Sequence, residues 1–401
     1  MLRGVELRAA RRIPWRLRRV EESFVADNHI QLLHDGKHAF PAMLEAIAAA
    51  REQVLLEMYW FDSDRIGRRF AEALAAAARR GVEVAVIYDA IGSIGANPEM
   101  FTELAAAGVK VVEFNPVAPW KRRFRLARLT RRDHRKILVI DGLIGFTGGI
   151  NIADQWLPEE EEGGGWRDDM VRVEGPAVRG FVRCFLRAWK SEGGPRLARH
   201  PANAGSGPEL AAAVSAAAAG QRVRVLGETF YRNRHTISRA YLSHIYRAQQ
   251  RVFIANSYFV PDGGVIRALE RAARRGVDVR IVVPGESDVP VANWASRAVW
   301  KRLMKSGVRI FQWTRSILHS KTAVIDGRWS TIGTFNLDHL SLRVNLEVNV
   351  TVLDESFGAT MESAFERDLA GSIEVDPREF RYRSLGDRLL EILAYRLRKF
   401  L

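Results

Sequence analysis

"DHRKILVIDGLIGFTGGIN", residues 133–151, has a counterpart in "LHSKTAVIDGRWSTIGTFN", residues 318–336. In both stretches a His is followed by Lys two positions later, by Asp seven positions later and by Asn seventeen positions later. The matched side chains are His134, Lys136, Asp141 and Asn151 in the first copy, and His319, Lys321, Asp326 and Asn336 in the second. One copy in each half of the chain indicates a duplicated functional unit.

The spacing of this motif predicts a strand, a turn and a second strand. Residues i and i+2 of a strand share a face, so His and Lys project together while Arg135 and Ser320 point the other way. "ILVI" and "TAVI" form the buried body of each strand, and Asp-Gly is a turn signal. Asp141 and Asp326 belong to the catalytic motif, although beside Gly they are first of all turn formers. The hairpin would return each Asn to its His.

Each copy then supplies an imidazole, an ammonium and an amide, which together suit a phosphate. Two histidines suggest that one attacks phosphorus covalently while the other moves the proton of the leaving and entering alcohols. Carboxylates and cysteines do not cluster at metal-ligand spacing, so we expect a reaction without a metal or cofactor.

A pair of acidic residues lies in two further predicted strands, "WRDDMVRVEG" (166–175) and "NLEVNVTVLD" (345–354). Aligning their valines puts Asp168 opposite Glu347, where each carboxylate could fix the tautomer of a catalytic His. A one-residue slip in register would exchange Asp168 for Asp169. Asp168 and Glu347 could instead be partners in salt bridges at the strand ends.

Other stretches repeat about 200 residues apart: "RRGVEVAVIYDA" (79–90) resembles "RRGVDVRIVVPG" (274–285). Amphipathic helices at 66–81 and 264–276 end at Gly before Val-rich strands, which predicts two α/β domains. We place these domains at 28–204 and 205–378, with a Gly- and Ala-rich linker around the boundary.

The chain of 401 residues carries a net charge of +14, which favours a polyanionic partner. Arg alternates with large apolar residues in an N-terminal segment (1–27), at 119–132 and in a C-terminal helix (379–401). Such segments lie in membrane interfaces, where each Lys or Arg contributes about 1 kcal/mol at an anionic surface. A helix packed on its own domain is the alternative for both terminal segments. The single cysteine, Cys184, and the lack of an apolar signal segment favour the cytoplasm.

With these motifs the chain resembles the phospholipase D superfamily over residues 28–375, and within it the bacterial cardiolipin synthases of the short type without N-terminal transmembrane helices. The resemblance implies an α/β fold of two α/β/α sandwich domains with one active site at their interface. It also implies a phosphohistidine on His134, with His319 as the acid; the reverse assignment of the two histidines is the alternative.

The expected activity is therefore a phosphatidyltransferase that makes cardiolipin from two phosphatidylglycerol molecules, bound peripherally to the cytoplasmic face of an anionic phospholipid membrane. Hydrolysis or transfer to another alcohol is the main alternative. A nuclease ranks lower because the basic segments are amphipathic, so nucleic acid is not the expected partner. A non-catalytic scaffold would favour a degraded motif, and both motifs are intact. Tyr258 and Phe259 are expected in the core.

Overall fold

The computed structural model describes residues 23–118, 120, 130–198, 220–228 and 235–400. The first half contains β1 (Val25–His34), α3 (Asp35–Ala49), β2 (Gln53–Met58), α4 (Arg65–Arg79), β3 (Glu83–Asp89), α5 (Pro98–Ala106), β4 (Lys110–Phe114), β5 (Lys136–Ile140), β6 (Ile144–Gly148), β7 (Asp169–Glu174) and α6 (Val178–Ser191). The second half contains β8 (Gln221–Gly227), α8 (Thr236–Arg247), β9 (Arg251–Asn256), α9 (Gly263–Arg274), β10 (Asp278–Pro284), α10 (Pro290–Met304), β11 (Arg309–Trp313), β12 (Lys321–Ile325), β13 (Trp329–Gly333), α11 (His339–Arg343), β14 (Val348–Leu353), α12 (Glu355–Ala370), β15 (Ser372–Glu374) and α13 (Leu385–Arg396).

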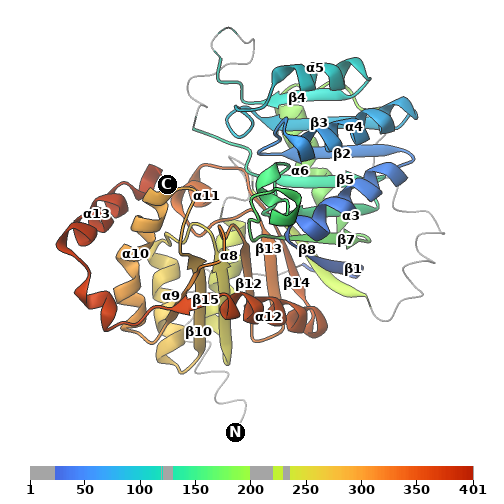
Figure 1. Ribbon diagram of the computed structural model, residues 1–401. Helices are drawn as coiled ribbons and strands as arrows, with labels where there is room; N and C mark the ends of the chain where they lie inside the picture. Colours follow the sequence, from blue (N-terminus) through green and yellow to red (C-terminus); the bar gives the residue numbers. More distant parts are fainter. Residues whose placement is uncertain (1–22, 119, 121–129, 199–219, 229–234, 401) are drawn as a thin grey trace.

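The strands form one mixed sheet whose order repeats the duplication seen in the sequence. That order is β15-β11-β10-β9-β12-β13-β14-β8-β1-β7-β6-β5-β2-β3-β4, so the two halves are mirrored about the antiparallel β8–β1 pair. Within each half three strands are parallel and are connected by helices (Figure 1). The α/β fold with two similar domains agrees with the sequence prediction.

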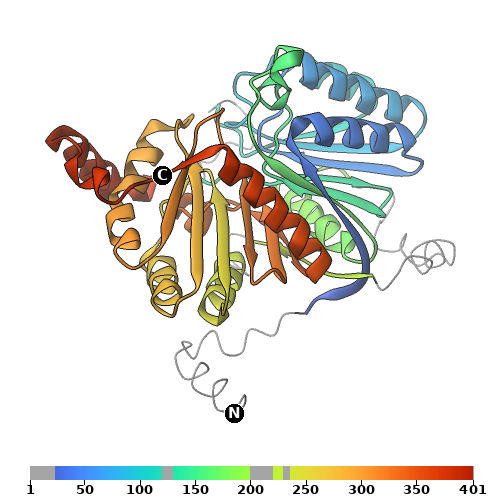
Figure 2. The same cartoon turned by 60° about the horizontal axis from the view of Figure 1, so that its bottom comes forward.

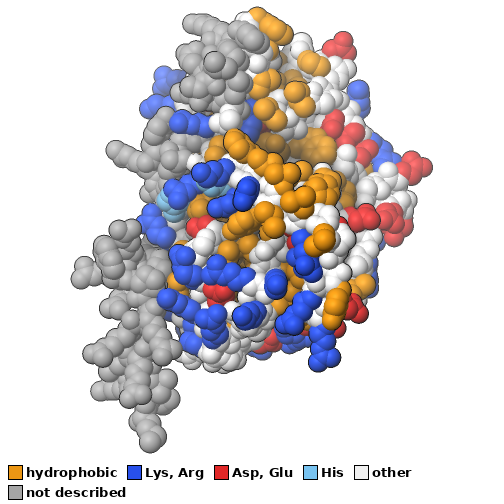
Figure 3. Space-filling model, turned by 90° about the vertical axis from the view of Figure 1, so that its left-hand side faces the viewer, with side chains coloured by type: hydrophobic (Ala, Val, Ile, Leu, Met, Phe, Trp, Pro, Cys, Tyr) orange, Lys and Arg blue, Asp and Glu red, His pale blue; other side chains and the backbone are white. Residues whose placement is uncertain are grey.

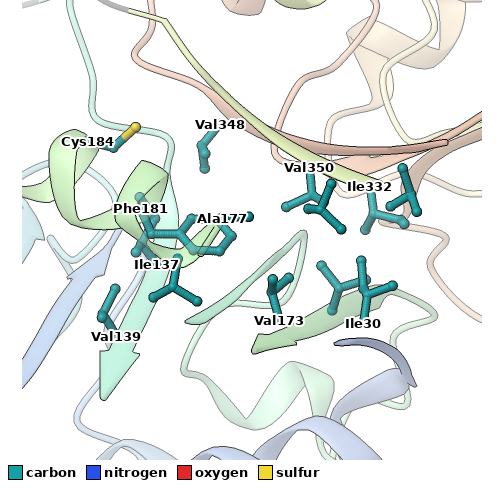
Figure 4. Packing of buried hydrophobic residues seen from close by; sticks show 14 of the residues in the cluster. Ile30, Ile137, Val139, Val173, Ala177, Phe181, Cys184, Ile332, Val348 and Val350 are labelled. Carbon is teal, nitrogen blue, oxygen red and sulfur yellow. The ribbon is translucent and has the colours of Figure 1, made fainter. Parts of the chain in front are cut away.

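Helices cover the sheet, and the hydrophobic cores lie between the helices and the sheet. α3, α4 and α5 pack on the first half, and α8, α9 and α10 pack on the second. A third core joins both halves, with Phe181 from α6 and strand residues such as Val173 and Val350 (Figure 4). Phe357 from α12 belongs to the same core. α6 contacts β8 of the second half, and α12 contacts β1 of the first half (Figure 2). Because a helix of each half packs on a strand of the other half, the two motifs keep a fixed orientation relative to each other.

Local signals explain the helices that cover the sheet. The carboxylate of Asp64 accepts from the N–H of Gly67 at the start of α4, and Asp262 caps α9 in the same way. Both helices are followed by a glycine in the left-handed region, Gly81 (φ +87°) and Gly276 (φ +89°), as a helix C-terminus requires. The helices predicted at 66–81 and 264–276 are thus confirmed.

Several predicted segments lie outside the described residues. These are the domain boundary near residue 205, most of segment 1–27, and most of segment 119–132, of which Trp120 is exposed. The boundary remains a prediction. Residues 379–400 form a short 3-10 turn (Glu379–Tyr382), α13 and a final 3-10 turn (Arg398–Phe400). None of the described helices has both the length and the hydropathy of a membrane-spanning segment.

Candidate active site

The two histidines stand where a strand of each half meets the other half. His134 comes just before β5, and its N–H donates to the carbonyl of Leu346 at 3.0 Å. His319 comes just before β12, and its N–H donates to the carbonyl of Arg167 at 2.8 Å. The residues that follow these two carbonyl groups are Glu347 and Asp168. The backbone itself therefore brings each His to a carboxylate of the other half.

Each imidazole contacts that carboxylate through Nδ1. Nδ1 of His134 lies 3.1 Å from both oxygens of Glu347, and Nδ1 of His319 lies 2.7 Å from Oδ2 of Asp168. An ionised carboxylate only accepts, so Nδ1 carries the proton and Nε2 is left for a reacting group. The predicted pairing of Asp168 and Glu347 with the histidines is present in the structure.

The two carboxylates are themselves held by hydrogen bonds. Glu347 accepts from the hydroxyl of Ser341 at 2.8 Å and from that of Thr334. Asp168 accepts from the indole Nε1 of Trp156 at 3.1 Å. Burial raises the pKa of Asp168 to about 6, against the opposing charge of Lys321. Such support fixes the orientation of each imidazole before a substrate binds.

Asp169, the alternative to Asp168, pairs with neither His134 nor His319 and lies 3.3 Å from Nδ1 of His34 instead. Its carboxylate pairs with Arg167 at 2.9 Å and accepts from Ser320 at 2.8 Å. The arginine holds the pKa of Asp169 below its usual range, although burial alone would raise it. Asp169 therefore anchors the back of the second motif, where Ser320 points as the strand alternation predicts.

The two lysines are fully buried beside the histidines. Nζ of Lys136 donates to the carbonyl of His134 at 2.9 Å, and Nζ of Lys321 donates to the carbonyl of His319. Burial and then Lys321 lower the pKa of Lys136 to about 7; burial lowers that of Lys321 to about 8. Nζ of Lys321 also lies 2.9 Å from Nδ1 of His319. The Nδ1–H group donates to Oδ2 of Asp168, which is closer at 2.7 Å. Two ammonium groups in one buried site favour an anionic ligand.

The predicted asparagines also reach the site. Oδ1 of Asn151 accepts from the N–H of Trp60 at 3.1 Å, and Oδ1 of Asn336 accepts from the hydroxyl of Ser257 at 2.8 Å. Both asparagines line the cavity that contains the two histidines. With each oxygen occupied, the NH₂ group of each amide is the part that can donate to a ligand.

The cavity has a volume of about 420 Å³ and is walled by aromatic rings that sequence reasoning did not identify. The ring of Tyr59 packs edge-on to that of His134, with ring centroids 4.9 Å apart. The ring centroids of Trp166 and His319 are 5.7 Å apart. Tyr258 lines the same cavity with its hydroxyl on Asp288 at 2.5 Å, so its expected place in the core was wrong. Phe259 is in the core as predicted. These rings come from loops outside the motifs. Only Trp166 lies close in sequence to a predicted site residue, Asp168.

Asp141 and Asp326 do not reach the cavity, which corrects their placement among the catalytic residues. Each lies in the turn at the far end of its motif strand, with φ of +52° and +53°. Asp141 accepts from the N–H groups of residues 51–53 at 2.8–2.9 Å, and Asp326 accepts from those of residues 249–251 at the same distances. Their carboxylates tie the hairpin to the start of the neighbouring strand.

Burial lowers the pKa of both catalytic candidates. The charge of Lys136 lowers the pKa of His134 further, while Glu347 opposes this shift. The charge of Lys321 adds to burial at His319, whose pKa falls well below its usual value. Both rings are therefore neutral near pH 7 in the unliganded site. A neutral imidazole with a free Nε2 is a nucleophile or a general base, and two of them share one cavity.

Comparison with known proteins agrees with this arrangement. The family model described as "Cardiolipin synthase, PLD-like domain" matches residues 43–164 and 241–369, more than half of the chain. Cardiolipin synthase B of Shigella flexneri and that of Escherichia coli K12 are each 35% identical over 378 residues, which cover 92% of this chain and 87% of the relative. The chain belongs to the phospholipase D-like family of cardiolipin synthases. A further family member, the cardiolipin synthase of Halalkalibacterium halodurans, is 34% identical over 365 residues, 90% of this chain and 70% of the relative.

Solved structures share the fold of this family member. Phosphatidylserine synthase of Haemophilus influenzae aligns with a TM-score of 0.69 and 14% identity, over 100% of this chain and 99% of that chain. Polyphosphate kinase of Porphyromonas gingivalis aligns with a TM-score of 0.57 and 16% identity, over 87% of this chain and 49% of that chain. At these identities the likeness concerns the fold alone, and it agrees with the α/β fold of this chain.

Proposed function

We propose that this protein is a phosphatidyltransferase that makes cardiolipin and glycerol from two phosphatidylglycerol molecules. The observation that carries the proposal is the pair of histidines in one cavity, each oriented through Nδ1 by a carboxylate of the other half. The names of the relatives, cardiolipin synthases at about a third identity over most of the chain, support the choice of substrate.

In the first step, Nε2 of His134 attacks the phosphorus of phosphatidylglycerol and forms a P–N bond. The P–O bond to the terminal glycerol breaks, and protonated His319 gives its proton to the leaving oxygen, so free glycerol departs. The assignment of His134 as nucleophile rests on resemblance to the family. A covalent intermediate divides one difficult displacement into two easier ones.

In the second step, neutral His319 takes the proton from the glycerol hydroxyl of a second phosphatidylglycerol. That oxygen attacks phosphorus, the P–N bond to His134 breaks, and cardiolipin is formed. The proton is back on His319 and the cycle closes without a net change in the enzyme. Acid–base help of this kind contributes about 10²–10⁴-fold in rate.

The surrounding groups suit the phosphate in both steps. Lys136 and Lys321 supply positive charge, and the amides of Asn151 and Asn336 supply N–H donors. A bound phosphodiester also raises the low pKa of His319, which lets it hold the proton that the first step needs. Preorganised donors in a buried site stabilise the charge that develops on phosphorus oxygens.

We further propose that the enzyme works as a peripheral protein at the cytoplasmic face of an anionic membrane, without a cofactor. The net charge of +14 and the phospholipid nature of the substrate support this location. The chain would comprise the two domains predicted from the duplication, at 28–204 and 205–378.

Purified protein incubated with vesicles of headgroup-labelled phosphatidylglycerol tests the reaction. We expect cardiolipin and free glycerol in equal amounts, and no product from a His134→Ala variant. Phosphatidic acid with glycerol would instead show hydrolysis. Cleavage of DNA, lost in the same variant, would show a nuclease.

A further inference from the structure

Helix α13 buries a charged side chain and exposes its leucines, which is the reverse of an ordinary surface helix. Its inward side carries Glu391, 2% exposed, which accepts from Arg297 of α10 at 3.1 Å and from Arg383 at 2.9 Å. Ala394 is the other buried residue of this side. A charged residue thus holds the helix against α10, where a packed helix would place leucines.

The leucines lie on the opposite side of α13, in the solvent. Leu389 is 67% exposed and Leu393 is 54% exposed, and these residues at i and i+4 stand one above the other. We call the whole set the α13 apolar face: Tyr382, Leu385, Leu389, Ile392, Leu393 and Leu397. More than half of the large hydrophobic side chains exposed in the described part of the chain lie in residues 382–400. Soluble proteins rarely leave so continuous an apolar surface without a partner.

Basic residues surround this face. Arg381, Arg388, Arg396 and Lys399 are all exposed beside it. Figure 3 looks onto this side of the molecule and shows hydrophobic side chains gathered together, with Lys and Arg side chains next to them. An apolar face with basic neighbours is complementary to the anionic headgroups and acyl chains of a bilayer surface.

The α13 apolar face leads to the mouth of the catalytic cavity. Phe400 follows α13, is 79% exposed and lines that cavity, and Ile91 of the first half, 40% exposed, lines it from the other side. A cavity of about 420 Å³ suits a headgroup, whereas the acyl chains of a phospholipid need another apolar medium. The mouth therefore has to meet the bilayer if the substrate is a phospholipid.

We infer that the α13 apolar face is the surface by which the enzyme docks on an anionic phospholipid bilayer, with the cavity mouth toward the headgroups. The inference rests on the proposed function for its orientation, but the docking itself needs no turnover. It assigns the leucines of α13 to lipid contact and Glu391 to holding the helix in place.

The test compares three proteins for binding to sedimented vesicles of phosphatidylglycerol and phosphatidylcholine: the wild type, Leu389→Gln/Leu393→Gln, and the matched control Val25→Gln/Ile373→Gln. The control removes two exposed apolar side chains from strands β1 and β15. Glutamine keeps the helix propensity of leucine, and both targets are exposed, so thermal melting should not change. We expect the α13 variant to bind roughly tenfold or more weakly and the control to bind like the wild type.

Turnover separates this inference from the proposed function. With phosphatidylglycerol of short acyl chains dispersed as monomers, we expect the α13 variant to keep wild-type activity, because the cavity is intact. If no protein turned over the lipid, the proposed reaction would fail while the loss of vesicle binding still supported docking. Equal vesicle binding by the α13 variant and the wild type would overturn the inference. The inference would also be overturned if the wild type did not bind vesicles but formed a dimer that the α13 variant could not form.

Discussion

At the scale of residues, His134 and His319 are alike in partners but unequal in environment. Both use Nδ1 for a carboxylate of the other half, yet burial and Lys321 lower the pKa of His319 further than that of His134. The duplicated motif was sufficient to predict both histidines. The valine alternation of two strands predicted Glu347 and Asp168 but left Asp169 as an alternative, because a slip of one residue exchanges them. The contact of Asp168 with His319 decides between them.

Glu347→Gln should lower kcat by about 10²–10⁴-fold while KM changes little, because the amide cannot accept the Nδ1 proton in the same way and the tautomer is no longer fixed. Loss of the negative charge also lowers the pKa of His134 further, since Glu347 now raises it. The acid limb of the kcat/KM profile should therefore move to lower pH, because the nucleophile must be neutral.

The control for this variant is Glu270→Gln, which removes a buried acid of α9 that pairs with Arg302 of α10 and does not line the cavity. Its kcat and pH profile should equal those of the wild type. An unchanged pH profile in Glu347→Gln, with activity lost only in proportion to unfolding, would show that Glu347 is merely structural.

At the scale of elements, the hairpins β5–β6 and β12–β13 present the site, and their turns are held by Asp141 and Asp326. The sequence predicted the hairpins from Asp-Gly and the apolar runs. It could not place the two carboxylates, because their partners are backbone N–H groups some 75–90 residues away, which no side-chain pattern marks. The same holds for α13, whose amphipathic pattern does not say which face meets the protein.

Asp141→Asn and Asp326→Asn should each cost about 1–3 kcal/mol of unfolding free energy, because an amide is a weaker acceptor for three N–H groups than a carboxylate. Asn tolerates the left-handed backbone at both positions, so strain is not added. Urea unfolding gives the cost, and kcat per folded molecule should stay within a few-fold of wild type. A hundredfold loss of kcat at unchanged stability would return either residue to the catalytic group.

At the scale of the whole molecule, the site exists because the two halves lie side by side in one continuous sheet, which brings their two motifs together. Each half contributes one His, with a buried Lys beside it, and supplies a carboxylate to the other half's His. The resemblance to the phospholipase D superfamily implied this shared site, whereas the aromatic walls at Tyr59 and Tyr258 were not predicted. They follow the ends of β2 and β9 at positions without a motif, and only the packing of the halves brings them together.

Binding of a phosphodiester should weaken above about pH 7–8, because Lys136 and Lys321, with pKa values of about 7 and 8, lose their charge there. A bound anion raises both pKa values, so binding takes up protons on the lysines between the free and bound values, in addition to the proton that His319 takes up at lower pH. Calorimetry with dimethyl phosphate in two buffers of different ionisation enthalpy measures this uptake. Lys136→Arg should reduce it, and an affinity independent of pH from 6 to 9 would refute the assignment.

The most direct test of the proposed chemistry is to trap the intermediate. The enzyme is mixed with phosphatidylglycerol labelled in the phosphatidyl group, quenched at alkaline pH where phosphohistidine survives, and mapped by peptide mass. We predict label on His134 in the wild type, none in His134→Ala, and none on His319 in any variant. Label on His319 alone would reverse the roles of the two histidines, and rapid turnover with no covalent label on either would contradict the two-step mechanism.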